Sequence, residues 1–273
     1  MHEIILLLFS CSIINVECIK IGSFNIQVFG QNKVSKTDVL SILVKILSRY
    51  DLIVVQEIRD AKNTAFRHLV DELNRYTKGN YKFVISEKLG RTNSKEQYGV
   101  IYKPDLIRIG KMVTFDNKKN LFERPPMAVE VHTTSSAIPM FALVVVHLDP
   151  DSVFEEVNNL YIFVKHIIKV WHTQNVLILG DMNADCGYLS KRKMKQIHLR
   201  TDTEFVWAIP DRHDTTLGKG NCAYDRIIIH GKQLKQAVKQ GSAKAYHFPS
   251  ELQIDNKLAK QVSDHYPVEL ELY

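Results

Sequence analysis

Continuous apolar runs alternate along this chain with segments in which apolar residues recur every three or four positions. The helical spacing is present at 37–49 and 152–171, and a third helix is expected from 63–64 to about residue 76. Short runs rich in Val, Ile and Leu predict β-strands at 19–29, 52–55, 81–86, 99–102, 142–146, 176–179, 226–229 and 268–272.

This alternation predicts an α/β fold. Several strand runs are apolar without a break, which is typical of strands covered on both faces. Two packed sheets with helices outside them would satisfy the pattern. Length and a hydrophobic content of 45% allow a large core, and no Pro, Gly or Ser tract suggests a linker. We therefore expect one domain over residues 19–273.

The first 18 residues have a different character. Residues 4–9 form an unbroken apolar run, too short to cross a membrane and placed where a secretory signal peptide would be. Cleavage after Cys18 would make the protein secreted, and no transmembrane segment is expected. The segment contains His2 and Glu3 but no Lys or Arg, so a buried first strand is the alternative.

Cysteine usage agrees with export. Of four cysteines, Cys11 and Cys18 would leave with the signal peptide, and Cys186 and Cys222 would remain. In a secreted protein such a pair favours a disulfide, which would stabilise the fold by roughly 3–4 kcal/mol. Two unrelated buried thiols are the alternative, and no cysteine spacing indicates a zinc site.

The net charge is positive. It is +6 for the whole chain and +8 without residues 1–18, which contain two acidic and no basic residues. Such a charge suits a polyanion such as nucleic acid, and also an anionic membrane surface. The basic run at 191–195 is open to three interpretations: a solvated helix face, a DNA-facing patch or a nuclear localisation signal.

Polar residues stand where several buried strands are expected to end. Glu57, His147 and Asp181 each follow such a run, and Asn183 comes two residues later. Enzymes of the α/β class assemble their sites at the carboxyl ends of strands. Carboxylate and amide oxygens suit Mg²⁺, Mn²⁺ or Ca²⁺, and histidines beside carboxylates suit proton transfer near neutral pH.

Seven segments carry this chemistry and also carry a resemblance. They contain, in order, Asn25, Glu57 with Arg59, Glu96, His147, Asp181 with Asn183, Asp225, and Asp264 with His265. With Gly-Asp-Met-Asn, Cys-Ala-Tyr-Asp-Arg and Ser-Asp-His-Tyr-Pro-Val, the chain resembles the deoxyribonuclease I family of the endonuclease/exonuclease/phosphatase superfamily. The resemblance extends over about 19–273, and Leu-Arg-Thr-Asp and Lys-Glu-Gln-Tyr look closest to gamma-type members.

The resemblance implies a fold and a reaction. The fold would be a four-layered α/β sandwich of two packed mixed β-sheets flanked by helices. The reaction would be divalent-metal-dependent hydrolysis of DNA to 5′-phosphate and 3′-hydroxyl ends. His147 oriented by Glu96, and His265 oriented by Asp225, would serve as general acid and base, in an order that the sequence leaves open.

The resemblance also implies binding residues. Glu57, Asp181, Asp264 and Asn25 would hold Mg²⁺ or Mn²⁺. Contacts to phosphate or DNA would come from Asn183, Arg59 in the minor groove, Arg124, Tyr188 and Tyr224. Cys186 and Cys222 match the stabilising disulfide of the family. We expect a monomer.

Three departures from the family pattern change these expectations. Ser94 replaces a Tyr that stacks on a sugar, which predicts weaker anchoring in the minor groove. The loop at 114–124 is short and carries Lys118, Lys119 and Asn120 in place of acidic residues, so one structural calcium site is expected to be absent. A second candidate calcium site, at Asp214 and Thr216, is weakened by Gly218 and Gly220.

Two other functions remain open. One is a phosphodiesterase of the same fold acting on sphingomyelin or an inositol phosphate, which Cys-Ala-Tyr-Asp-Arg and the basic charge disfavour. The other is an inactive module that binds DNA or actin, which the complete set of catalytic side chains disfavours. Actin binding is undecided, because Phe83, Ile85 and Met127 at the expected contact positions are apolar but are not the usual set.

Overall fold

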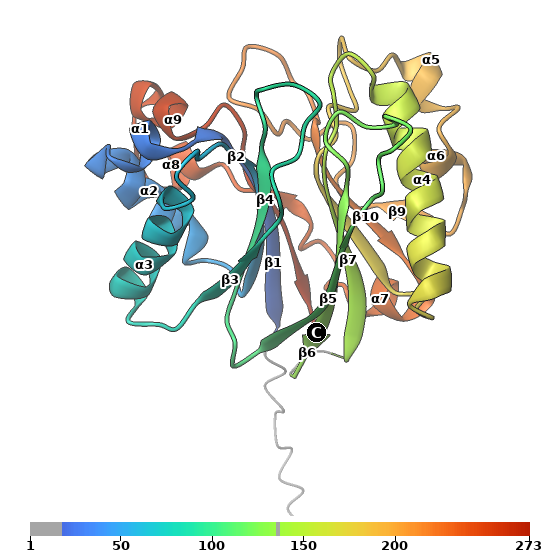
Figure 1. Ribbon diagram of the computed structural model, residues 1–273, viewed down its shortest axis with the longest axis horizontal. Helices are drawn as coiled ribbons and strands as arrows, with labels where there is room; N and C mark the ends of the chain where they lie inside the picture. Colours follow the sequence, from blue (N-terminus) through green and yellow to red (C-terminus); the bar gives the residue numbers. More distant parts are fainter. Residues whose placement is uncertain (1–17, 135–136) are drawn as a thin grey trace, which may run out of the picture.

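The computed structural model describes residues 18–134 and 137–273, in which two six-stranded mixed sheets lie face to face (Figure 1). The first sheet has the spatial order β11 (Lys244–Ala245), β12 (Val268–Leu272), β1 (Ile19–Phe29), β2 (Leu52–Ile58), β4 (Gln97–Tyr102) and β3 (Lys82–Ile85). The second has the order β5 (Ile107–Thr114), β6 (Met127–Thr133), β7 (Met140–His147), β8 (Val176–Asp181), β10 (Asp225–His230) and β9 (Phe205–Trp207).

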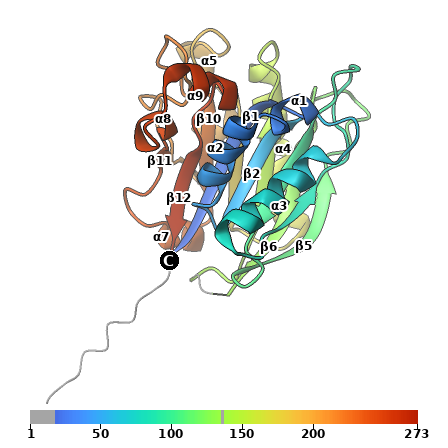
Figure 2. The ribbon, with the colours of Figure 1, turned by 90° about the vertical axis from the view of Figure 1, so that its left-hand side faces the viewer.

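Helices cover the outer face of each sheet, which makes four layers (Figures 1 and 2). The first sheet is covered by α1 (Gln31–Val34), α2 (Thr37–Leu47), α3 (Ala65–Thr77), α8 (Phe248–Glu251) and α9 (Asn256–Val262). The second is covered by α4 (Val153–Val170), α5 (Lys191–Met194) and α6 (His198–Thr201). The short α7 (Lys232–Ala237) adds apolar side chains to the core between the sheets. The expected four-layered α/β sandwich is confirmed.

The unbroken apolar strands are explained by these layers. Leu177 and Leu179 of β8 face the core between the sheets, whereas Val176 and Ile178 face the outer helices. In β2, Val54 faces inward and its neighbours face α2 and α3. Successive side chains of a strand point to opposite faces, so a strand between two apolar layers needs apolar residues at every position.

The structure bears on three expectations from the sequence: the signal peptide, the absence of a transmembrane segment and the position of Met127. The predicted signal peptide, 1–18, lies outside the described residues except for Cys18. None of the described helices has the length and apolar character needed to span a membrane. Met127, one of the positions considered for actin, is 1% exposed in the core between the sheets and cannot meet a partner.

Candidate active site

Strand direction gathers the polar residues at the end of the sandwich opposite the carboxyl terminus (Figure 1). β7 and β8 are parallel with His147 beside Asp181, and β10 runs antiparallel to β8 and begins with Asp225 beside Asp181. The first sheet delivers Asn25 and Glu57 from the parallel strands β1 and β2. Four of the predicted site residues are therefore placed by backbone pairing, and Glu57 follows Gln56, the strand partner of Asn25.

The first histidine–carboxylate pair joins the two sheets. His147 ends β7 in the second sheet, and Glu96 immediately precedes β4 in the first; His147 Nδ1 lies 2.8 Å from Glu96 Oε2. The buried hydroxyl of Tyr98 accepts the His147 amide at 3.1 Å. Arg59 Nη2 donates to Glu96 Oε1 at 2.6 Å. Burial alone would raise the pKa of Glu96, but His147, Arg124 and Arg59 outweigh it and lower the pKa to about 2.

The second pair joins the sheets in the opposite sense. Asp225 begins β10 in the second sheet, and His265 lies three residues before β12 in the first; His265 Nδ1 is 2.7 Å from Asp225 Oδ2. Burial would lower the pKa of His265, but the charges of Asp225 and Asp181 raise it to about 10. Burial also raises the pKa of Asp225 against the effect of His265, so the pair binds a proton tightly.

Asp181 stands between the two pairs. Its Oδ2 atom lies 3.7 Å from Nε2 of His147 and 3.6 Å from Nε2 of His265. Burial opposes ionisation of Asp181, but the two imidazoles and hydrogen bonds from Asn25 and Asn183 hold its pKa below the ordinary value. Both Nδ1 atoms are bonded to carboxylates, which leaves the Nε2 atoms free to act on a substrate. The two Nε2 atoms lie on either side of Asp181 Oδ2.

The expected metal ligands lie close together, but the Asn25 side chain does not present its oxygen to the others. The side-chain amide of Asn25 donates to Glu57 Oε1 and Asp181 Oδ2, each at 3.0 Å. Its nitrogen, not its oxygen, therefore faces these carboxylates. Asp264 is 54% exposed, with Oδ1 3.8 Å from His265 Nε2. Two neighbouring carboxylates are a donor set that a hard divalent cation fits.

A second grouping overlaps this one. Among the described residues, Asp181, Asp225 and His265 have ligand-type atoms within 4.8 Å of one another. Asp225 and His265 are already paired, which makes them a less available donor set than Glu57 and Asp181. The buried Oδ1 atom of Asp225 nevertheless lacks a hydrogen-bond partner, so it remains open to an added group.

The predicted DNA-contact residues near the pairs are turned toward the protein. Arg124 donates to the carbonyls of His147 and Leu148 at 3.0 and 3.1 Å, and its side chain is 12% exposed. Asn183 donates to Leu148 O at 2.9 Å. Arg59 is held by Glu96 as described above. These contacts place the side chains at the site, and a phosphate or groove contact from them stays a prediction.

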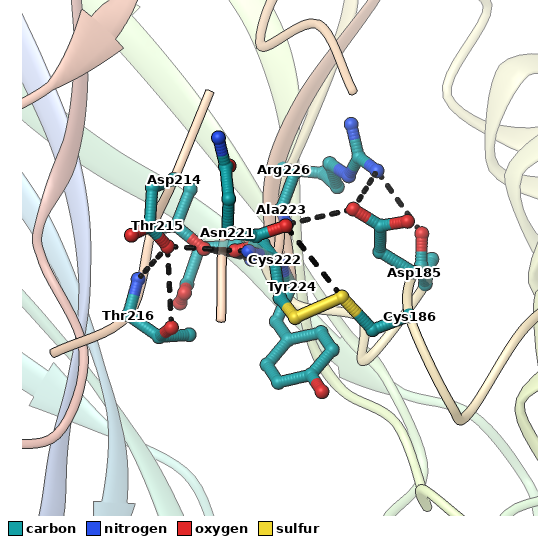
Figure 3. The surroundings of a disulfide bond; sticks show 12 residues. Asp185, Cys186, Asp214, Thr215, Thr216, Asn221, Cys222, Ala223, Tyr224 and Arg226 are labelled. Atoms are coloured by element: carbon teal, nitrogen blue, oxygen red, sulfur yellow. Dashed lines mark hydrogen bonds and ion pairs between the residues drawn. A yellow bond between two sulfur atoms is a disulfide. The ribbon is translucent and has the colours of Figure 1, made fainter. Parts of the chain in front are cut away.

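The predicted disulfide is confirmed (Figure 3). Cys186 and Cys222 are joined by an S–S bond of 2.00 Å that links the segment after β8 to the segment before β10. Beside it, the rings of Tyr188 and Tyr224 have centroids 5.2 Å apart. Tyr188 is 47% exposed, so this aromatic pair is accessible next to the site.

The candidate calcium residues are engaged with each other. Asp214 Oδ1 accepts from the amide and hydroxyl of Thr216 at 3.1 and 3.2 Å, and from Cys222 N at 3.2 Å (Figure 3). In the 114–124 loop, the Asn117 side chain bonds both main-chain atoms of Phe122. Calcium dependence therefore stays a prediction.

The basic run forms α5, a short helix with one buried face. Met194 is buried, whereas Lys191, Arg192, Lys193 and Lys195 are exposed. This exposure fits a solvated helix face and equally a DNA-facing patch, so the role of the run stays a prediction.

Three residues that support the site had no assigned role in the sequence. Thr215 accepts the amides of Tyr224 and Asp225. Ser263 donates to Asn25 O at 2.6 Å and accepts from His265 N at 3.0 Å. Lys33 donates to main-chain carbonyls. Of the three, only Ser263 could have been found from the sequence, by its place in Ser-Asp-His. Thr215 and Lys33 bond main-chain atoms, and such bonds leave no recognisable sequence pattern.

Comparisons with known proteins identify the family of the chain. Residues 22–265 match the model of the Endonuclease/Exonuclease/phosphatase family. Deoxyribonuclease-1 of Bos taurus is 37% identical over 259 residues, which cover 93% of this chain and 92% of that protein. Deoxyribonuclease-1 of Oryctolagus cuniculus is 39% identical with the same coverage. Deoxyribonuclease-1-like 2 of Mus musculus is 37% identical, covering 94% and 93%.

Solved structures agree in fold at low identity. A functionally unknown conserved protein from Enterococcus faecalis V583 gives a TM-score of 0.64 at 19% identity, covering 93% of this chain and 99% of that one. The human Nocturnin catalytic domain gives 0.63 at 16%, covering 94% of both. Because the family model matches most of the chain and the deoxyribonuclease-1 relatives are 37–39% identical over 93% of it, this chain belongs to the endonuclease/exonuclease/phosphatase family and, within it, to the deoxyribonuclease I group.

Proposed function

We propose that this protein is a secreted, divalent-metal-dependent endonuclease that hydrolyses DNA phosphodiester bonds. The observation that carries the proposal is the convergence of His147 Nε2 and His265 Nε2 on Asp181 Oδ2, at 3.7 and 3.6 Å. Two imidazoles held by carboxylates on either side of one point suit a reaction that needs a base and an acid at once.

The proton transfers follow from this geometry. One Nε2 atom accepts a proton from water as its oxygen attacks phosphorus, and the other donates a proton to O3′ as the O3′–P bond breaks. The products are a 5′-phosphate and a 3′-hydroxyl. Glu96 and Asp225 hold the Nδ1 protons, fix the ring orientations and stabilise the imidazolium forms.

Charge on the phosphate must also be stabilised. Mg²⁺ or Mn²⁺, held by Glu57 and Asp181 with Asp264 and Asn25 beside them, would supply a Lewis acid for the phosphoryl oxygens. Asn183 and Arg124 bond the main-chain carbonyls of Leu148 and His147 and are candidates for neutral and cationic contacts to phosphate. A basic net charge would favour binding of a DNA strand.

Export is part of the proposal. Residues 4–9 form the apolar run of a leader in a segment without Lys or Arg, and the Cys186–Cys222 disulfide is of the kind that persists in oxidising compartments. The mature chain would begin at Ile19, the first residue of β1. Mass spectrometry of the protein recovered from the medium of secreting cells tests this boundary; a product retained in the cells with residues 1–18 intact would contradict it.

Plasmid nicking tests the reaction. Supercoiled plasmid is incubated with the protein in Mg²⁺ and Ca²⁺, with EDTA in a parallel tube. We expect nicked circles that require metal and that His265→Ala reduces by at least about a hundredfold. His166→Ala, at an exposed histidine of α4, is the matched control and should keep activity. Intact plasmid with the folded wild-type protein would overturn the proposal and direct the search to lipid phosphodiesters.

A further inference from the structure

The carboxyl-terminal end of β1 contains a strained bulge. The pairing of β1 with β2 shifts register between Asn25 and Phe29, and within this stretch Gln27 and Val28 have φ values of 44° and 50°. Left-handed backbone is unfavourable for residues other than glycine, and most of all for a β-branched residue such as Val28. The side chain of Val28 is 51% exposed, so its packing does not explain the conformation.

The bulge positions two of the candidate metal ligands. The amide of Val28 donates to Glu57 Oε2 at 2.8 Å, and the amide of Gln27 donates to Asn25 Oδ1 at 2.9 Å. The remaining polar atoms of the two side chains bond each other: Asn25 Nδ2 donates to Glu57 Oε1. The backbone turn therefore sets the orientation of both Glu57 and Asn25.

One lysine holds the bulge from the other side. The ammonium of Lys33, on α1, donates to the carbonyls of Ile26 (2.9 Å), Gln27 and Val262 (3.0 Å). An ammonium has three N–H groups, and here each has a main-chain acceptor. Val262 immediately precedes Ser263, whose hydroxyl bonds Asn25 O and His265 N. Lys33 thus ties the bulge to the segment that carries His265.

We propose that Lys33 is a positioning residue that stabilises the strained bulge at Gln27 and Val28 and thereby orients Glu57 and Asn25 for metal binding. Its ammonium donates to main-chain carbonyls, so it would act on the metal site through the backbone. Its kinetic consequence rests on the function proposed above, but its structural consequence does not.

Hydrogen exchange tests the structural part on the metal-free whole chain. Lys33→Met removes the three donors and keeps an unbranched side chain that is one atom shorter. We expect amide exchange in residues 26–29 to accelerate at least about tenfold while the core of β1 around Ile21 stays protected. Lys36→Met, the same change at an exposed lysine three residues away, should leave both regions unchanged. Unchanged exchange at 26–29 in Lys33→Met would overturn the proposal.

Kinetics test the functional part. In Lys33→Met we expect kcat for DNA cleavage to fall about 10- to 100-fold, the range typical of residues that orient metal ligands, with KM changed less than about threefold. Lys36→Met should match the wild type. A faster-exchanging bulge with unchanged kcat would reject the positioning role alone, whereas an inactive wild-type protein would reject the proposed function and leave the exchange result standing.

A second variant separates lost donors from relieved strain. Glycine adopts positive φ without a steric penalty, so Val28→Gly in the Lys33→Met background should restore part of the protection at 26–29 and part of kcat. If Lys33→Met does not fold, the double variant should be the more stable of the two in urea. A double variant no better than Lys33→Met by either measure would contradict the role of Lys33 in offsetting the strain.

Discussion

The side-chain amide of Asn25 donates a 3.0 Å hydrogen bond to Oδ2 of Asp181, which lies 156 residues later in the chain and in the other sheet. The same amide also serves Glu57. One neutral donor therefore holds two carboxylates together at the centre of the site.

Asn25→Asp should destabilise the metal-free protein at pH 7. The exchange replaces a donor by a third carboxylate of the same shape, and buried groups that lose a charged hydrogen bond cost about 1–3 kcal/mol or more. The loss should shrink as the pH falls, because protonation removes the repulsion. Urea unfolding at pH 7 and pH 5 in EDTA measures both effects. Asn80→Asp, at an exposed position, is the control; equal losses in the two variants would refute the account.

Thr215→Val should lower both stability and turnover. The buried Thr215 hydroxyl accepts the amides of Tyr224 at 3.0 Å and Asp225 at 3.1 Å and donates to Cys222 O at 3.2 Å. Valine keeps the volume but leaves the amides of Tyr224 and Asp225 unpaired, at about 1–3 kcal/mol. The carbonyl of Cys222 keeps its hydrogen bond from Thr215 N.

The expected loss of turnover arises through Asp225, because the position of its backbone determines the orientation of the His265 ring. We expect kcat to fall about tenfold with little change in KM. Thr215→Ser retains the hydroxyl and should restore most of both properties. If serine behaves as valine does, the hydroxyl is not the group that matters.

Glu96 should make the protein sensitive to acid. Its folded-state pKa of about 2 lies below the ordinary 4.5, so its ionised form stabilises the fold above pH 4.5, and this contribution disappears as the pH falls toward 2. The full contribution is at most roughly 3 kcal/mol. Glu96→Gln should therefore lose less stability than the wild type between pH 5 and pH 2.5, as followed by urea unfolding. Glu251→Gln, at an exposed carboxylate, should follow the wild-type curve.

Removal of the disulfide should destabilise the fold without abolishing it. Cys186 and Cys222 are 36 residues apart, and closing such a loop stabilises a protein by roughly 3–4 kcal/mol. The double variant Cys186→Ser, Cys222→Ser should therefore unfold at lower urea concentration. Reductant should shift the wild-type curve to the same place and leave the variant unmoved; a wild type indifferent to reductant would contradict this prediction.

Much of the fold could be predicted because the strong strands are apolar at every position. The limits predicted for β1 and β12 match those observed, and the three long helices were placed within a few residues. The sequence pattern predicts neither β5 nor β6. β5 is an edge strand with exposed residues and a shift in register between Ile109 and Met112, and Glu130 and His132 interrupt the apolar run of β6. β9 and β11 were missed because three and two residues are too few to show a period.

The site divides in the same way. Residues at strand ends, such as His147 and Asp181, could be predicted because strand direction determines where they gather. The role of Lys33 could not be predicted, because its hydrogen-bond partners are main-chain carbonyls, which every residue has. The direction of the Asn25 amide was also beyond the sequence, since it depends on which neighbours reach it in the folded chain.

Each histidine–carboxylate pair takes one partner from each sheet: Glu96 and His265 from the first, His147 and Asp225 from the second. A small slide of one sheet over the other would therefore part both pairs together, and turnover would fail in a single step. Catalysis therefore requires the two sheets to be packed together in the correct position. A cut between β4 and β5 leaves His265 with Asp225 on the second fragment, because β11 and β12 of the first sheet follow β10 in the chain, and it separates Glu96 from His147. Each fragment should therefore be inert, and DNA nicking should return only when the fragments reassociate.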